Sequence, residues 1–101
     1  MQDEFKSLRD KLHAEFAQVD WKEIERFFSR GMLINVSKEL DLLAVAEAMA
    51  NDDRKSVQFW IDSGGVARMT DDIALDFARR QPALWAVVVA PWILVQERII
   101  H

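Results

Sequence analysis

The amino-acid sequence predicts an α+β domain in which about five helices pack on a small sheet of three or so strands. Apolar residues recur with helical spacing in several segments that begin at a capping residue or end at glycine. Shorter runs between them are rich in β-branched residues, which favour strands, and the valines at residues 87–89 are the clearest case. A chain of 101 residues, half of them apolar, can bury one core, so residues 1–101 are predicted to form a single domain.

The first part of the chain is predicted to form two helices with a short break near residues 18–20. An apolar stripe runs along the first helix and is formed by Phe5, Leu8, Leu12, Phe16 and Val19. Asp20 is predicted to cap the second helix, since Glu23 follows three residues later as in a capping box. The apolar stripe of this helix is formed by Trp21, Ile24, Phe27 and Phe28. Gly31 is expected to end it, because glycine readily adopts the left-handed conformation found after helices.

The next segment is predicted to contain a strand at residues 32–36 and a third helix. Either Ser37 or Asp41 caps this helix, which continues to about Ala50. Its apolar stripe is formed by Leu42, Val45, Ala46 and Met49.

A fourth helix is predicted to begin after either Asp52 or Asp53, both of which are suitable caps. Its apolar residues are Val57, Trp60 and Ile61. Residues 62–65, which include two glycines, end the helix, and residues 66–69 are a candidate second strand.

A fifth helix is predicted between Thr70, its N-cap, and Pro82, which closes it. Asp71 and Asp72 lie in its first turn, and Arg79 and Arg80 lie in its last. This order of charges complements the helix dipole.

The C-terminal part of the chain carries an uncharged, mostly apolar run at residues 84–96. Residues 84–90 are predicted to form a strand with apolar side chains on both faces, which is typical of a strand covered on both sides. Beyond Pro91, residues 92–100 either continue as a strand after a bend or begin a helix with proline at its first position, and we favour the strand. The run is therefore either the centre of the core or a surface that another molecule covers.

Pro91 favours an interface, because proline lacks a backbone N–H and is mostly confined to sheet edges and bulges. An edge strand with this much apolar surface needs a cover. A homodimer formed by self-pairing is the simplest cover, and an unknown protein partner is the alternative. The predicted contact surface also includes the apolar stripe of the first helix. The candidate interface residues on the strand are Trp85, Pro91, Trp92, Leu94 and Gln96.

Three segments of the chain are distinctive in combination. They are Phe27, Phe28 and Gly31, then residues 40–53, and then residues 87–96 with their Pro-Trp step and final glutamine. Together they resemble a family of short bacterial proteins known only as a domain of unknown function, over nearly the whole chain. The resemblance implies no established activity, ligand or catalytic residue.

The order of elements over residues 20–69 is also similar to that of winged-helix domains. In such a domain the helix that begins near Asp53 would enter the major groove. Its candidate contacts are Arg54, Lys55, Ser56 and Gln58. A regulator that binds nucleic acid is therefore the alternative function. The net charge of −4 and the aspartates that flank this helix argue against it.

No arrangement of residues in the sequence suggests catalysis, a metal site or a cofactor. Cysteine is absent, and neither His13 nor His101 lies in a motif that pairs a base with a nucleophile. Helix capping and the helix dipole explain Asp71 and Asp72 without a metal ion. No catalytic residue, metal or cofactor is predicted, and the chain is expected not to be an enzyme.

The sequence predicts a cytoplasmic protein that acts by binding. Residues 1–20 lack the apolar core of a signal peptide. The apolar run at residues 84–96 is shorter than the roughly 20 residues that a membrane-spanning helix needs. The absence of cysteine fits a reducing compartment. A small-molecule site lined by tryptophan and phenylalanine is a third alternative.

Overall fold

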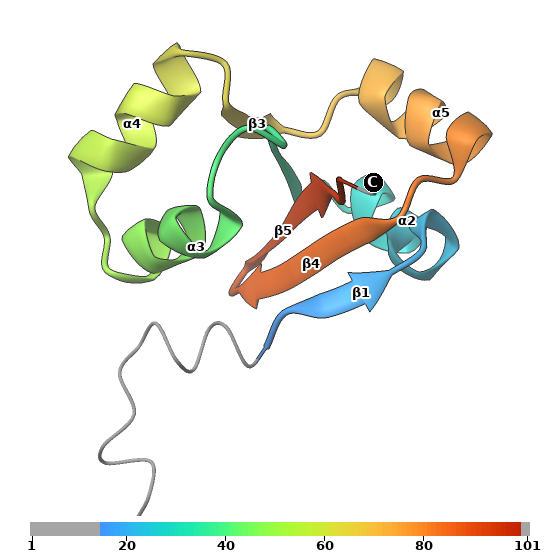
Figure 1. Ribbon diagram of the computed structural model, residues 1–101, viewed down its shortest axis with the longest axis horizontal. Helices are drawn as coiled ribbons and strands as arrows, with labels where there is room; N and C mark the ends of the chain where they lie inside the picture. Colours follow the sequence, from blue (N-terminus) through green and yellow to red (C-terminus); the bar gives the residue numbers. More distant parts are fainter. Residues whose placement is uncertain (1–14, 100–101) are drawn as a thin grey trace, which may run out of the picture.

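The computed structural model describes residues 15–99, which form four helices and five strands (Figure 1). The helices are α2 (Trp21–Ser29), α3 (Leu42–Ala50), α4 (Arg54–Asp62) and α5 (Asp71–Arg80). The strands are β1 (Ala17–Val19), β2 (Leu33–Val36), β3 (Val66–Arg68), β4 (Leu84–Val89) and β5 (Trp92–Glu97). They form one sheet in the order β1-β4-β5-β2-β3, in which β2 and β5 are parallel and the other neighbours are antiparallel. The α+β class is confirmed, with more strands than predicted.

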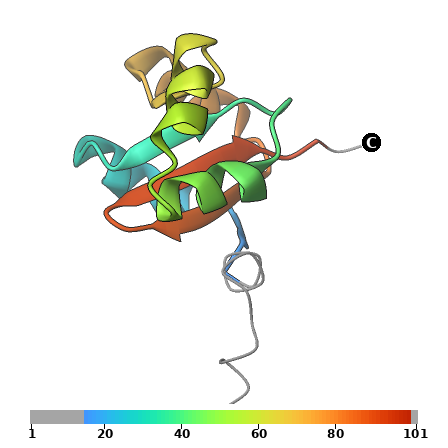
Figure 2. The ribbon, with the colours of Figure 1, turned by 90° about the vertical axis from the view of Figure 1, so that its left-hand side faces the viewer.

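Helices cover both faces of the sheet. α2 and α5 lie on one face, and α3 and α4 lie on the other (Figure 1). Figure 2 looks onto α3, which lies across β4 and β5. Each face buries its own cluster of apolar side chains. The first cluster includes Trp21, Leu33, Phe77 and Leu84, and the second includes Val36, Val45, Val87 and Leu94.

The two C-terminal strands form a hairpin at the centre of the sheet. β4 and β5 pair antiparallel, and residues 90–91 make the turn between them. Leu84 faces α2 and α5, whereas Val87 faces α3, so the prediction of a strand covered on both faces is confirmed for residues 84–87. Nearer the turn the cover is incomplete, and Val88 is 54% exposed. The preference for a strand after Pro91 is also confirmed for residues 92–97. No helix within residues 15–99 is long and apolar enough to cross a membrane.

The prediction for the end of the first helix is wrong. Ala17–Val19 forms β1, because these residues pair with β4, where Ala17 lies opposite Ala86. Pairing with a distant strand has outweighed the helical spacing of Phe16 and Val19. Phe5, Leu8 and Leu12 lie outside the described residues.

The winged-helix-like arrangement of residues 20–69 is also wrong. In a winged-helix domain the three helices pack together around one core. Here α2 packs with α5 on the face of the sheet opposite α3 and α4. The apolar stripe of α2 is buried in the cluster that it shares with α5, where Trp21 packs edge-on against Phe77 at a centroid distance of 5.9 Å.

Most of the predicted helix caps are present. Asp41, Asp53 and Thr70 cap α3, α4 and α5 through their side chains. The other two candidates, Ser37 and Asp52, lie before these positions. Asp20 precedes α2, but its side chain makes no capping hydrogen bond, so the predicted capping box is wrong.

Candidate functional site

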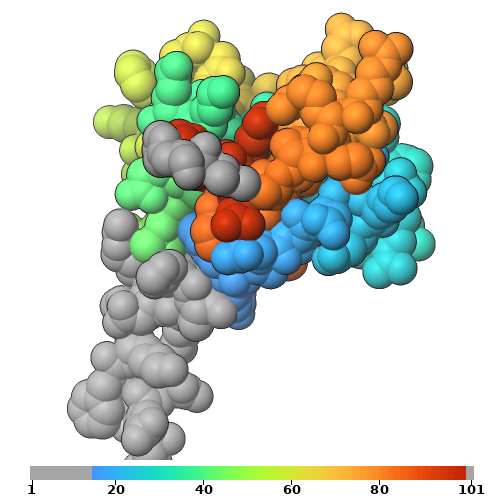
Figure 3. Space-filling view, turned by 45° about the vertical axis from the view of Figure 1, so that its right-hand side comes forward, coloured from blue at the N-terminus to red at the C-terminus, as the bar shows by residue number. Residues whose placement is uncertain are grey.

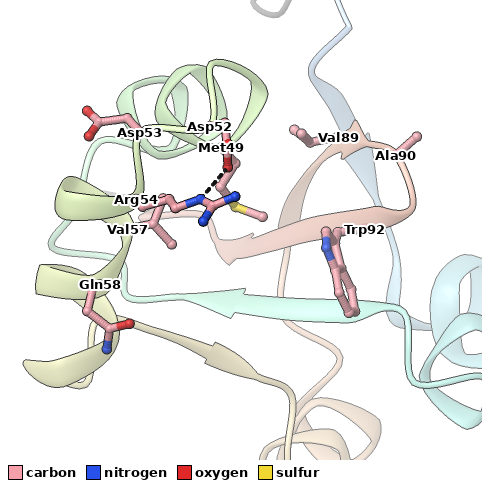
Figure 4. A pocket seen from close by; sticks show the side chains of 9 residues that line it. All are labelled: Met49, Asp52, Asp53, Arg54, Val57, Gln58, Val89, Ala90 and Trp92. Atoms are coloured by element: carbon pink, nitrogen blue, oxygen red, sulfur yellow. Dashed lines mark hydrogen bonds and ion pairs between the residues drawn. The ribbon is translucent and has the colours of Figure 1, made fainter.

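A hollow of about 380 Å³ opens at the end of the sheet where β4 turns into β5. The β4–β5 turn lies on one side of it, and the residues that join α3 to α4 lie on the other (Figure 4). Its lining consists of Met49, Asp52, Asp53, Arg54, Val57, Gln58, Val89, Ala90 and Trp92. The end of α3, the first turns of α4 and the hairpin therefore position the site.

Part of this lining is apolar and only partly buried. Met49, Val89 and Trp92 lie at the margin of the core cluster beneath α3 and α4. Val89 and Trp92 are directly opposite each other in the β4–β5 register, so their side chains lie on the same face. Val57 of α4 is likewise partly buried. An apolar group of a ligand would complete the burial of these side chains.

Trp92 is in contact with the side chain of Arg68, which lies at the edge of the sheet. The guanidinium carbon of Arg68 lies 5.0 Å from the centre of the Trp92 ring. Arg68 belongs to edge strand β3 and lies opposite Ile34 of β2, on the same face as the hollow. Such a contact contributes roughly 0.5–1 kcal/mol at an exposed site.

Charged side chains of both signs stand around the apolar lining. Arg54 pairs with Asp52 at 3.3 Å between Nε and Oδ1, and their side chains are 86% and 76% exposed. The carboxylate of Asp53 accepts hydrogen bonds from the hydroxyl and the backbone N–H of Ser56. These bonds hold the pKa of Asp53 below its ordinary value, the hydroxyl contributing most. Asp53 is therefore charged at neutral pH.

The candidate interface residues differ in their exposure to solvent. Pro91 is exposed in the turn and Trp92 lines the hollow, so this part of the predicted surface is accessible. Leu94 and Gln96 are buried, with 0% and 8% exposure, and cannot contact a partner. Trp85 lies on the same face but outside the hollow, beneath the guanidinium of Arg98 at 4.9 Å.

The prediction of an apolar edge strand is wrong. β5 is the central strand of the sheet, paired with β4 on one side and with β2 on the other. Pro91 needs no ladder partner because it lies in the turn that leads into β5. The sequence could not indicate this, because the parallel pairing of β2 with β5 joins segments about 60 residues apart.

The alternative nucleic-acid residues lie on α4, and two of them line the same hollow as Trp92. These two are Arg54 and Gln58. The side-chain amide of Gln58 donates a hydrogen bond to Asp62 at 2.7 Å. Lys55 is exposed outside the hollow. Sequence reasoning missed Met49, Val89 and Arg68 as site residues, because nothing local marks them.

Comparison with known proteins assigns the chain to a family. The model of a protein family of unknown function, DUF2288, matches residues 7–97. The chain belongs to the DUF2288 family. The resemblance seen in the sequence is thereby confirmed. The chain is also similar to PA1075 from Pseudomonas aeruginosa, with 46% identity; the NMR solution structure of that protein matches with a TM-score of 0.81 over 99% of this chain and 94% of that one. No curated protein matches the chain.

A second polar feature of this DUF2288 chain lies at the other end of β5. Arg80 donates two hydrogen bonds to Asp76 and two to Glu97, at distances of 2.7–3.0 Å. In Figure 3 the end of β5 (red) is seen between the α5–β4 segment (orange) and the loop after β2 (green). The bonds from Arg80 hold the pKa of both carboxyl groups below their ordinary values. Carboxylates bound in this way are poorly suited to general acid–base catalysis near neutral pH.

The described part of this DUF2288 chain, residues 15–99, contains no group of three or more His, Cys, Asp or Glu side chains that could hold a metal ion. The hollow beside Trp92 is therefore the candidate binding site. It combines incompletely buried apolar side chains with charged groups around them.

Proposed function

We propose that this chain is a binding module that holds a segment of a partner protein in the hollow beside Trp92. The composition of the hollow is the observation that supports the proposal. Partly buried apolar side chains are surrounded by charged groups of both signs. Protein interfaces have this anatomy, with an apolar centre and a polar rim. Tryptophan is also among the residues that most often carry the binding energy of an interface.

A separate partner fits this surface better than self-pairing through β5. Both edges of β5 are already occupied by β4 and β2, so the strand offers no backbone groups to a second copy. A hollow of about 380 Å³ suits one or two inserted side chains of a partner. We expect light scattering at high micromolar concentration to give the mass of a monomer. A dimer that dissociates when Trp92 is changed would instead identify a second copy as the partner.

Selection from a random peptide library displayed on phage tests the proposal. The wild-type protein is the bait, and the selected peptides are then tested for binding to the Trp92→Ala variant. We expect enriched peptides that bind with micromolar affinity and that compete with one another. Peptides that bind wild type and Trp92→Ala equally would refute the hollow as the binding site, and so would the absence of any enriched sequence.

Two further variants separate loss of the site from loss of the fold. Gln58→Trp places a large side chain at the hollow from an exposed position of α4, and we expect it to block the selected peptides. Phe59→Ala is the matched control, because Phe59 lies on the same helix, is 68% exposed and does not line the hollow. We expect it to bind like the wild type.

A further inference from the structure

The charged side chains beside the hollow differ in whether they have a bonding partner. Asp53 is engaged by Ser56, and Asp52 is paired with Arg54. Within residues 15–99, no carboxylate forms an ion pair or hydrogen bond with Arg68. Arg68, which is in contact with the Trp92 ring, is therefore a cation without an anionic partner among residues 15–99.

The contact with Trp92 leaves Arg68 able to bind an anion. A guanidinium carries its five N–H donors in its own plane and can cover a ring while it donates hydrogen bonds to a carboxylate. The ring also restricts the side chain, which lowers the entropy that a new hydrogen bond would cost.

Arg54, which lines the hollow on the α4 side, provides a second cation. Its pair with Asp52 is long and almost fully exposed, and exposed ion pairs of this kind contribute little. Arg54 can therefore exchange Asp52 for a carboxylate of a ligand at small cost.

We infer that the partner segment is acidic and carries an apolar side chain next to a carboxylate. The apolar side chain would lie against Trp92, Met49 and Val57, and the carboxylate would be bound by Arg68. This inference rests on the proposed function, since it assigns the chemistry of the ligand to the same hollow.

Three synthetic heptapeptides test the inference. Each has a central phenylalanine, flanked by glutamates in the first peptide, by glutamines in the second and by lysines in the third. Each is titrated at low salt into the ¹⁵N-labelled full chain while its NMR spectrum is followed. The indole N–H signal of Trp92, assigned with Trp92→Phe, reports binding at the hollow. We expect the acidic peptide to shift this signal and to bind roughly tenfold more tightly than the glutamine peptide.

Variants of Arg68 then test whether this side chain causes the preference for the acidic peptide. We expect Arg68→Gln to lose most of the preference for the acidic peptide and Arg68→Lys to retain part of it. Arg26→Gln is the matched control: the Arg26 guanidinium also covers a ring, that of Phe27 at 4.8 Å, but it lies on α2 at the opposite face of the sheet. We expect it to leave the preference unchanged.

The outcomes separate this inference from the proposed function. Two outcomes with shifts at Trp92 would overturn the inference that the ligand is acidic: equal binding of the acidic and glutamine peptides, or stronger binding of the lysine peptide. Either outcome would leave the hollow as a binding site. An unchanged preference in Arg68→Gln would also overturn the inference. If no peptide shifts the Trp92 signal, the acidic segment is refuted, and the library selection decides whether the hollow binds peptides at all.

Discussion

Gln96 donates a hydrogen bond from its side-chain amide to the backbone carbonyl of Leu40 at 2.7 Å. The same amide bonds the carbonyl of Ser37 at 2.8 Å. A buried polar side chain of the central strand thus holds the loop between β2 and α3 in place. Its role is internal, which explains why a residue that looks unusual at the end of an apolar run is not part of an interface.

Replacing Gln96 should therefore destabilise the fold. We expect Gln96→Leu, which keeps the side-chain size, to lower the free energy of unfolding by about 2 kcal/mol, because two carbonyl groups lose their partner. Urea unfolding followed by circular dichroism measures the change. Gln58→Leu is the control, since its amide bonds only an exposed aspartate, and we expect a change below about 0.5 kcal/mol. Similar losses in both variants would contradict the assigned role of Gln96.

The Asp76–Arg80–Glu97 network should make stability depend on pH. Arg80 lowers the pKa of both carboxyl groups in the folded state, so their contribution is present above the unfolded pKa values of roughly 4. It is lost as the pH falls through the lower folded values. We expect the difference in unfolding free energy between wild type and Arg80→Met to shrink as the pH is lowered from 7 to about 3.

Lys22→Met, at an exposed position of α2, is the control for this experiment. We expect its difference from wild type to change less over the same range. A difference between wild type and Arg80→Met that stays constant with pH would show that the network does not couple folding to protonation.

The caps of α3 and α2 provide a matched comparison. The carboxylate of Asp41 accepts bonds from two backbone N–H groups of α3, whereas Asp20 makes no such bond to α2. We expect Asp41→Ala to cost about 1 kcal/mol of stability and Asp20→Ala to cost little. Thermal unfolding of the two variants measures this, and equal losses would argue that local capping does not decide the stability of either helix.

Nucleic acid should not bind to α4. Asp52 and Asp53 place two negative charges at the start of the helix, and the amide of Gln58 already donates to Asp62 at its end. We expect no change in fluorescence anisotropy when labelled duplex DNA or single-stranded RNA is mixed with the protein at low salt. Micromolar binding that weakens steeply as salt rises would contradict this expectation, because that is the behaviour of phosphate contacts.

Local signals in the sequence were sufficient for most helices and for the character of the C-terminal strands. Thr70 with its two following aspartates marks the start of α5, and the valines of β4 mark a strand that is apolar on both faces. These features depend on neighbouring residues: a cap is bonded within one turn, and side chains of a strand alternate whatever its partner is. The sequence alone therefore determined the α+β class and the apolar character of both faces of β4.

Only the tertiary structure decided which strands are neighbours and which side chains form the site. β5 became the central strand through its parallel pairing with β2, and Ala17–Val19 became a strand through its pairing with β4. The same packing places Arg54 and Gln58 of α4 in the lining of one hollow with Trp92. Such contacts join residues far apart in the chain, and no spacing or propensity within a segment specifies the distant segment that will cover it.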